Sequence, residues 1–388
     1  MREQEWMLAH SAAPEQIDAP ACLEKLLEQM EAGLSGRGRI PMLPSYLSTR
    51  IAAPEGAVCP VMDAGGTNLR TARAVLEEGK WHLEELEKTA MPGTGGEELS
   101  FRAFYGALAK PLKRLDGIER VGCCFSYNVS LGRELDGVLD FWCKEVRVPE
   151  AVGMPVGASL RDALGGDCRA VRVLNDSVAA MLGAEDANVG VMLGTGVNVC
   201  YAERCARIPK VPADLRGEEM IISTEVGEFD GFPRSTFEEA VIAATDAPDS
   251  AVAEKQCSGG YLGDIIAALW RAAEAEGLLE RCPEGDLGSV SRLLQEQPDA
   301  PAAKLAVIAV RRAAKIAAVL CAGPILRTGE RHVRIAVEGS QYWRLTGFRE
   351  AFHRELDGLL PEGLTYEILR TENACLIGAA RAAFAEPM

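Results

Sequence analysis

The hydrophobic positions of this chain change their spacing several times, and each change predicts an element. Apolar residues with helical spacing occupy positions 23–30, and Gly33 follows them as a stop signal, which predicts an opening helix. Short apolar runs come next at 58–62, 69–76 and 81–86, separated by turn-forming residues. This pattern is typical of a strand–turn–strand arrangement that opens a sheet.

Strands and helices alternate along the rest of the chain. The expected elements are a helix over 97–112, strands over 118–125 and 171–174, a helix over 178–184 capped by Ser177, strands over 189–193 and 198–203, helices to about Ala322 and a strand over 333–337. The strand–turn–strand plan with a following helix therefore occurs twice, from residue 58 and from residue 189. This duplication favours two lobes of similar topology that face a shared cleft.

Length, composition and charge narrow the class of protein. Of the 388 residues, 48% are apolar and 25% charged, which is typical of a globular protein. The chain is longer than a domain built around a single hydrophobic core. The formal net charge of −16 repels phosphate backbones and anionic lipid surfaces, which argues against nucleic-acid and membrane partners. A small anion such as ATP can still bind, because backbone N–H groups and helix N-termini act locally.

Cysteine usage and the chain start predict a cytoplasmic protein. The twelve cysteines are scattered without a CxxC pair, and the start lacks an apolar signal region, which predicts buried free thiols rather than disulfides or zinc. The apolar stretch 305–326 is interrupted by Arg311, Arg312 and Lys315, so we expect an amphipathic interior helix and no bilayer span. Because the sequence shows no obvious exposed apolar stripe, we expect a monomer.

Two glycine-containing turns follow apolar runs. In Asp63-Ala-Gly-Gly-Thr-Asn-Leu-Arg70 a carboxylate stands at a strand end before two residues without bulk, so that backbone N–H groups can approach a phosphate while Asp63 holds Mg²⁺ through water. Gly194-Thr195-Gly196 could hold the transferring phosphate from the other lobe. Each turn alone also fits a plain hairpin, but the pair favours a nucleotide clamp.

Asn175 and Asp176 stand where a strand ends and a helix begins, a position that exposes side chains at the carboxyl edge of a sheet. Phosphoryl transfer to an alcohol needs a carboxylate that orients the hydroxyl and accepts its proton, and Asp176 fits that role. The alternative is an ordinary helix N-terminal aspartate. None of the four histidines is near these turns, so carboxylate chemistry is favoured over histidine chemistry.

The order of several short motifs resembles that of the eukaryotic-type hexokinases from about Leu23 to the last helix. The matching segments are 28–35, 42–46, 63–70, 93–99, Phe125-Ser126, 174–178, 194–201, 224–227, 258–263 and 337–340. This resemblance implies a two-lobed α/β fold of the actin-like ATPase (ribonuclease H-like) class, with mixed sheets flanked by helices and a cleft between lobes. We expect a small lobe over 58–175 completed by a helix at 376–388, a large lobe over 176–375, and residues 1–57 packed on the large lobe.

The resemblance also implies an activity and a role for each matching residue. It implies ATP-dependent phosphorylation of a glucose-like hexose at the 6-hydroxyl, with Mg²⁺ as cofactor. Asp176 and Arg70 would be catalytic, and Asp63 would hold the metal through water. Sugar hydroxyls would meet Ser126, Lys144, Asn175, Asp176, Glu225 and Glu254, and the nucleotide would meet Asp63, Gly65, Gly66, Thr67, Asn68, Arg70, Gly194, Thr195, Gly196, Glu338, Gly339 and Ser340. Without the resemblance, Glu225, Glu254 and Lys144 would be interpreted as solvated surface charges.

Several positions depart from the family pattern. Tyr127-Asn128 replaces the usual Phe-Pro, Cys143 the usual Thr before Lys144, Glu145-Val146 the usual Gly-Phe, Ser223 the usual Asn, and Val226 the usual Trp. These changes bear on the preferred sugar. The usual Gly-Ser-Gly-Lys-Gly turn is replaced at 371–378, which bears on the nucleotide.

Two other functions fit the same motifs. A hexokinase-like sugar sensor would bind a sugar without catalysis. The argument against it is the retention of Asp63, Thr67, Asp176, Thr195 and Glu225. A kinase of the same architecture that forms an acyl phosphate would lack the run of sugar contacts.

Overall fold

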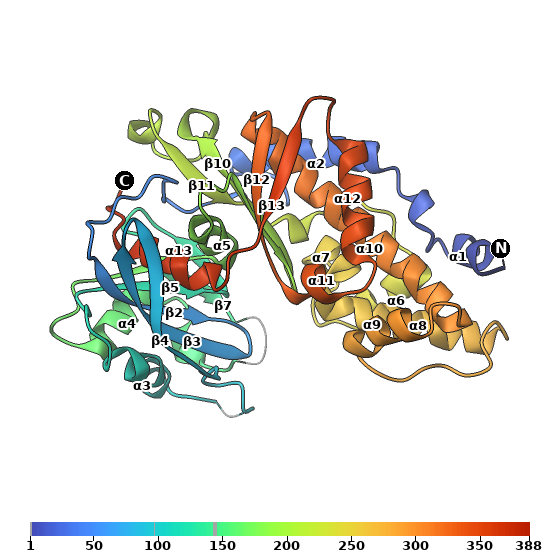
Figure 1. The fold of residues 1–388 in the computed structure, drawn as a ribbon, viewed down its shortest axis with the longest axis horizontal. Coiled ribbons are helices and arrows are strands. Elements are labelled where there is room, and N and C mark those ends of the chain that lie inside the picture. The colour runs from blue at the N-terminus through green and yellow to red at the C-terminus, as the bar shows by residue number, and fades with distance from the viewer. Residues whose placement is uncertain (1, 97, 143–145) are drawn as a thin grey trace.

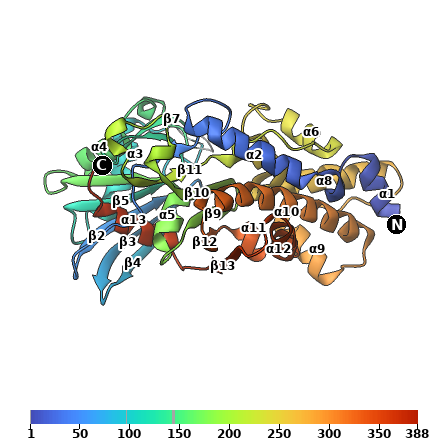
Figure 2. The same ribbon diagram turned by 90° about the horizontal axis from the view of Figure 1, so that it is seen from above.

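Two central sheets organise the computed structural model, which describes residues 2–96, 98–142 and 146–388. The sheets lie side by side along the long axis, and the chain ends lie at opposite ends of that axis (Figures 1 and 2). We call the half with the five-stranded sheet the small lobe and the half with the six-stranded sheet the large lobe. No helix among the described residues is both long enough and apolar enough to cross a bilayer.

The small lobe contains a mixed sheet with strand order β4-β3-β2-β5-β8. Its strands are β2 (Val58–Ala64), β3 (Asn68–Glu77), β4 (Lys80–Ala90), β5 (Arg120–Phe125) and β8 (Ala170–Leu174). The first three are antiparallel, and β2, β5 and β8 are parallel. A separate antiparallel sheet consists of the two strands β6 (Asn128–Leu131) and β7 (Gly137–Phe141), which follow β5 in the chain.

Alternation along these strands buries both faces of the small-lobe sheet. Met62 and Ala64 of β2 pack into one apolar cluster with α3 (Phe101–Leu112) and α4 (Val156–Leu164). Cys59 and Val61 of the same strand pack into another with α5 (Asp176–Gly183) and α13 (Ala374–Ala383). Because successive side chains of a strand point to opposite faces, one strand joins both clusters. The C-terminal helix α13, red in Figure 1, thus lies among the blue strands near the start of the chain.

The large lobe repeats this plan with one added edge strand. Its sheet order is β1-β11-β10-β9-β12-β13, and the strands are β1 (Leu43–Pro44), β9 (Val189–Leu193), β10 (Val197–Arg204), β11 (Glu219–Ser223), β12 (His332–Glu338) and β13 (Thr365–Leu369). Strands β11, β10 and β9 are antiparallel, and β9, β12 and β13 are parallel. The order β11-β10-β9-β12-β13 matches β4-β3-β2-β5-β8, which confirms the predicted duplication.

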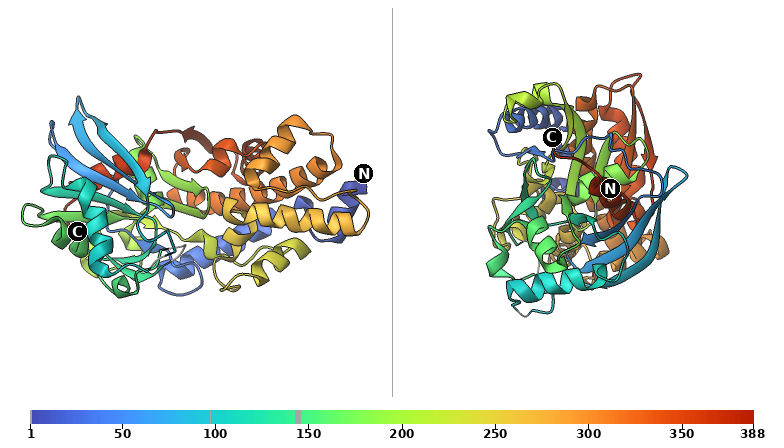
Figure 3. Two further views of the ribbon diagram at one scale, coloured as in Figure 1. Left: turned by 90° about the horizontal axis from the view of Figure 1, so that it is seen from below. Right: turned by 90° about the vertical axis from the view of Figure 1, so that its left-hand side faces the viewer.

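Helices cover the large-lobe sheet and extend beyond it (Figure 3). They are α1 (Arg2–Ala9), α2 (Ala19–Leu34), α6 (Thr236–Ala243), α7 (Val252–Cys257), α8 (Gly259–Ala275), α9 (Leu287–Glu296), α10 (Pro301–Thr328), α11 (Ser340–Arg344) and α12 (Phe348–Leu359). The long helix α10 is buried over most of its length. Its Arg312 is 2% exposed and pairs with buried Glu238 at 2.8 Å, so α10 is interior, as predicted, but it is not amphipathic in the predicted sense.

Other local predictions were corrected by the structure. Gly33 does not stop the opening helix, which continues to Leu34 and is followed by left-handed Gly36. Ser177 does not cap α5, because the N-cap is Asn175, whose side chain accepts from Ser177 N. The helix expected over 97–112 begins at Phe101 behind the N-cap Ser100, and Glu97 lies outside the described residues.

The sequence pattern did not predict several elements, among them α1, α4, α11, α12, β1, β6, β7, β11 and β13. The edge strands are short or carry few apolar residues, and hydrogen bonding to a neighbouring strand stabilises them more than their own pattern does. The predicted lobe boundaries at 58–175 and 176–375 stay a prediction, because α5 and α13 pack against residues from both sheets, including Val61 and Ala336.

Candidate functional site

The first glycine turn joins β2 to β3 in the small lobe. Asp63 and Arg70 are direct partners in the antiparallel register, so the turn Gly65–Thr67 lies beyond a fixed pair of charged side chains. Gly65 N donates to Asn68 O at 3.0 Å, and the Tyr127 hydroxyl donates to Gly65 O at 2.9 Å. Tyr127, one of the departures from the family pattern, therefore supports the first glycine turn.

Arg70 links that turn to the C-terminal helix. Its Nε donates to Asp63 Oδ2 at 2.9 Å, and its Nη1 donates to Asn373 Oδ1 at 3.2 Å. Burial lowers the pKa of Arg70, but the adjacent Asp63 carboxylate outweighs burial and the pKa is raised. Asn373, at φ 55°, belongs to the altered segment 371–378 and directly precedes α13. The altered segment thus contacts the predicted phosphate site through Arg70.

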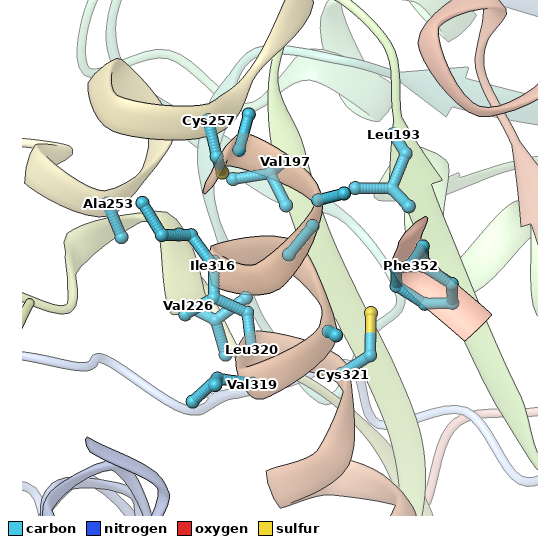
Figure 4. Packing of buried hydrophobic residues seen from close by; sticks show 14 of the residues in the cluster. Leu193, Val197, Val226, Ala253, Cys257, Ile316, Val319, Leu320, Cys321 and Phe352 are labelled. Carbon is cyan, nitrogen blue, oxygen red and sulfur yellow. The ribbon is translucent and has the colours of Figure 1, made fainter. Parts of the chain in front are cut away.

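The second glycine turn joins β9 to β10 at the corresponding place in the large lobe. Gly194 O accepts from Gly259 N at 2.8 Å, and Thr195 O accepts from Gly260 N at 3.0 Å, so the start of α8 holds the turn. Gly339 also packs against this turn, because a Cβ atom at Gly339 would stand 2.1 Å from Leu193 O. Leu193 and Val197 anchor the turn in the apolar core shown in Figure 4.

Glu338 connects the second turn to the first. It ends β12 beside Met192 of β9, which places the segment 338–340 next to Gly194. Burial raises the pKa of Glu338, Arg70 lowers it and Asp63 raises it. Three residues that were all predicted to meet the nucleotide therefore interact electrostatically.

Asp176 lies in the same region as Asp63. Both belong to segments around Cys375, whose Sγ donates to Asp176 O at 3.7 Å. A hydrogen bond with Cys124 lowers the pKa of Cys375, but burial raises it overall, and the carboxylates of Asp63, Glu338 and Asp176 add to the rise. The charges of three predicted carboxylates thus act on one buried thiol.

Asn175 and Asp176 begin α5, as the apolar strand β8 and its polar end predict. Asn175 Oδ1 accepts from Ser177 N at 2.8 Å and from Ser177 Oγ at 2.7 Å. Asp176 Oδ1 also accepts from Ser177 N at 2.8 Å. Both side chains are half-buried, and these bonds fix their directions at the helix N-terminus, where backbone N–H groups favour negative charge.

Glu225 follows β11 with a left-handed backbone, φ 58° and ψ 43°. Its Oε1 accepts from Asn198 Nδ2 at 2.7 Å and from Ser223 Oγ at 2.8 Å. Burial raises the pKa of Glu225; the Ser223 bond lowers it, and the charge of Asp176 raises it. The carboxylate is therefore half-buried and near Asp176, so its interpretation as a solvated surface charge is wrong.

Asn198 is a candidate site residue that the sequence interpretation did not select. Its Oδ1 accepts from Glu225 N at 3.0 Å while its Nδ2 binds the Glu225 carboxylate. A polar residue two positions after the second glycine turn, within the apolar first half of the strand, was the available signal.

Glu254 of α7 lies against the second turn. Its Oε2 accepts from Val197 N at 3.0 Å, and a Cβ at Gly196 would stand 2.6 Å from that oxygen. Gly227, two residues after Glu225, lies on another side, with a Cβ position 3.2 Å from Glu254 Cβ. Glu254 is thus also half-buried rather than solvated, and it lies close to the segment that carries Glu225.

The remaining predicted sugar residues are Ser126 and Lys144. Ser126 N donates to Ala64 O at 3.1 Å, which places Ser126 beside the first turn. Lys144 lies outside the described residues. Thr67, Thr195 and Ser340 are exposed at their turns, where they can meet a ligand.

The residues present fit a magnesium–nucleotide. Mg²⁺ keeps several waters and uses one or two carboxylates together with substrate phosphates. Asp63 supplies one buried carboxylate beside a turn of small residues, and no group of three or more His, Cys, Asp or Glu side chains in the described ranges could form a protein-only metal cage.

Family models match almost the whole chain. A model described as hexokinase matches residues 14–185, and a second model with the same description matches 188–296 and 291–385. Hexokinase-2 of Oryza sativa subsp. japonica is 29% identical over 420 residues, covering 91% of this chain and 85% of that protein.

Other relatives match over a shorter region. Hexokinase-2 of Solanum tuberosum is 32% identical over 277 residues, which span 64% of this chain and 56% of that protein. The solved hexokinase from Schistosoma mansoni complexed with glucose superposes with a TM-score of 0.79 and 23% identity over 95% of each chain. That likeness confirms the actin-like two-lobed fold.

Proposed function

This chain belongs to the hexokinase family, and from that premise we propose that it transfers the γ-phosphoryl group of Mg-ATP to the 6-hydroxyl of glucose or a related hexose. The observation that carries the proposal is the position of Asp176. Its backbone carbonyl accepts from Cys375 Sγ at 3.7 Å, and the next residue, Ser177, contacts Ser223, which donates to Glu225. These contacts support a location of Asp176 between the predicted phosphate side and the predicted sugar side.

In the proposed reaction, Asp176 accepts the proton of the sugar hydroxyl as its oxygen attacks the γ-phosphorus. The bond between that phosphorus and the bridging oxygen breaks, and ADP leaves. The Ser177 N–H that binds Asp176 Oδ1 holds the carboxylate in one orientation, which a positioned base requires. Bound magnesium would neutralise phosphate charge, and Arg70 would add a second positive group on the same side.

The sugar side supplies acceptors and donors for several hydroxyls. Asn175, Glu225 and Glu254 are half-buried and held by hydrogen bonds, and Asn198 extends this set. A buried polar set of this kind discriminates strongly between sugars, because a missing hydroxyl leaves a site group unpaired. The glucose bound to the Schistosoma mansoni hexokinase supports a glucose-like substrate.

We also propose that the protein is a cytoplasmic monomer.

The test is Asp176→Asn in a coupled ADP assay. Asparagine keeps the acceptor for Ser177 N but removes the base, so we expect kcat to fall by about 10²–10⁴-fold with the unfolding temperature unchanged. Wild-type turnover in this variant would refute the base assignment.

A substrate panel separates the competing functions. Hexoses, hexosamines and small acids are supplied to the wild-type protein, and ADP release is recorded beside calorimetric sugar binding. Hexose-dependent ADP release supports the kinase. Sugar binding without ADP indicates a sensor, and ADP release with acids alone indicates an acyl-phosphate-forming kinase.

A further inference from the structure

Ser223 occupies a buried position between two predicted sugar contacts. It is the last residue of β11 and is 2% exposed. Glu225 follows it by two residues, and Ser177 of α5 approaches it from the other side. The family pattern described above has an asparagine here, so this hydroxyl is a feature of the present chain.

The hydrogen bonds around Asn198 determine which group receives the hydroxyl proton of Ser223. Asn198 Oδ1 accepts from Glu225 N at 3.0 Å and from Val199 N at 2.8 Å, which fixes the amide so that Nδ2 is a donor. Nδ2 donates to Ser223 Oγ at 3.0 Å and to Glu225 Oε1 at 2.7 Å. Ser223 Oγ accepts from Asn198, so its own proton is available for Glu225 Oε1 at 2.8 Å.

The contact with Ser177 does not use that proton. Ser177 Oγ lies 3.5 Å from Ser223 Oγ and 2.7 Å from Asn175 Oδ1. The shorter distance indicates that the Ser177 proton is donated to Asn175, since hydroxyl bonds weaken beyond about 3 Å. The two serines therefore touch, while each donates to a different sugar contact.

We propose that Ser223 is a positioning residue for the sugar: it holds Oε1 of Glu225 so that the other carboxylate oxygen meets the hexose, and its contact with Ser177 sets the separation of Glu225 from Asn175. The inference rests on the proposed sugar site. It names a residue that acts through Glu225, without touching the sugar itself.

Local forces show why Glu225 needs such support. Its left-handed backbone, φ 58°, is a costly conformation for a residue with a side chain. Asn198 stabilises it by accepting from the Glu225 backbone N–H and donating to the Glu225 carboxylate. Its carboxylate also faces negative charge from Asp176 of α5 and Glu228 of the following turn, with Glu254 of α7 beyond Gly227. A donor on Oε1 keeps the ionised form available as an acceptor.

The experiment measures glucose binding to the full chain by calorimetry, with Ser223→Ala as the variant. Loss of one hydrogen bond to a charged group weakens binding by about ten-fold or more, so the glucose Kd should rise by that factor. The KM for ATP should stay within about two-fold, because Ser223 belongs to the sugar side alone.

The pH dependence provides a readout that a purely structural role would not move. Glucose binding requires ionised Glu225, so it weakens as pH falls through the pKa of that carboxyl group. Ser223 lowers this pKa, and its removal should therefore make the weakening begin at a higher pH in Ser223→Ala than in the wild type.

Two further variants serve as controls. Ser223→Thr keeps the hydroxyl and should restore most of the affinity. Ser159→Ala removes another buried hydroxyl, which donates to Pro155 O in α4, and should leave glucose binding unchanged. Thermal unfolding is recorded for every variant.

Three results would overturn the proposal. The first is a glucose Kd in Ser223→Ala equal to that of the wild type, and the second is an unshifted pH dependence. The third is an equal weakening of glucose and ATP. If the wild type binds glucose but releases no ADP, the kinase proposal fails while this inference stands or falls on the same Kd values.

Discussion

The two glycine turns occupy the same place in duplicated sheets but are built by different means. The small-lobe turn depends on side chains: Asp63 and Arg70 pair across the strands, and Tyr127 binds the Gly65 carbonyl. The large-lobe turn depends mainly on close backbone packing, with Gly339 and Gly259 against Leu193 and Gly194, and on one side chain, Glu254, that binds Val197 N. Duplication thus preserved a three-residue connection and not its support, so the two turns should fail in different ways.

Replacing Asp63 tests the side-chain turn and should have the larger effect on activity. Asp63→Asn keeps an acceptor for Arg70 but removes the charge proposed to hold magnesium through water. We expect kcat/KM for Mg-ATP to fall by about 10²–10³-fold, as when one charge-stabilising group is lost, with glucose affinity unchanged. Steady-state kinetics and calorimetry measure the two quantities.

A parallel variant separates charge from position. Glu84→Gln removes an exposed carboxylate that pairs with Arg73 of the same sheet and should leave kcat/KM near the wild-type value. Equal losses in both variants would mean that the sheet, rather than Asp63, is responsible.

Replacing Gly339 tests the backbone turn and should act on stability as well as activity. An alanine there has φ 118° and a methyl group 2.1 Å from Leu193 O, so the turn must move. Backbone strain of this kind costs about 1–3 kcal/mol, which we expect as a lower unfolding temperature and a raised KM for ATP.

Gly166→Ala is the matched control for that experiment, since nothing lies within 4 Å of its Cβ position. Its unfolding temperature should stay at the wild-type value. An unchanged unfolding temperature and KM in Gly339→Ala would show that the large-lobe turn tolerates displacement.

The smallest effect should come from Asn373, which joins the side-chain turn to α13. Asn373→Ala removes one hydrogen bond to Arg70, 3.2 Å long, while the ion pair with Asp63 remains. A partly exposed bond of this kind contributes about 0.5–1.5 kcal/mol, so kcat/KM for ATP should fall only by about three- to ten-fold. A loss as large as that of Asp63→Asn would make Asn373 a main support of the turn.

Much of the fold was predictable from residue pattern. The strands that open each sheet were recognised because buried strands are continuous apolar runs bounded by turn residues, as at 58–62 and 189–193. Strand β13 was missed because the strand that it pairs with, β12, is separated from it in the chain by α11 and α12. The pairing of buried Arg312 with Glu238 could not be predicted for the same reason, since an arginine in a helix is ordinarily exposed.

The candidate site was predictable as residue types and only partly as contacts. Asp63, Asn175 and Asp176 stand at strand ends, and the alternation of strands and turns predicts that position. The support for Glu225 was not predictable, because Asn198, Ser223 and Ser177 come from three different elements. Nor does spacing along the chain reveal that Tyr127 supports the first turn.

Local periodicity was enough to predict the strands that open the two sheets, the glycine turns between them and the carboxylates at strand ends, because glycine turns use conformations that only small residues adopt easily. Tertiary structure alone decided which side chains hold one another, as in the contacts of Arg70 with Asn373 and of Ser223 with Glu225. Hydrogen bonds and burial depend on distance in space, and folding brings residues hundreds of positions apart to within 3.2 Å.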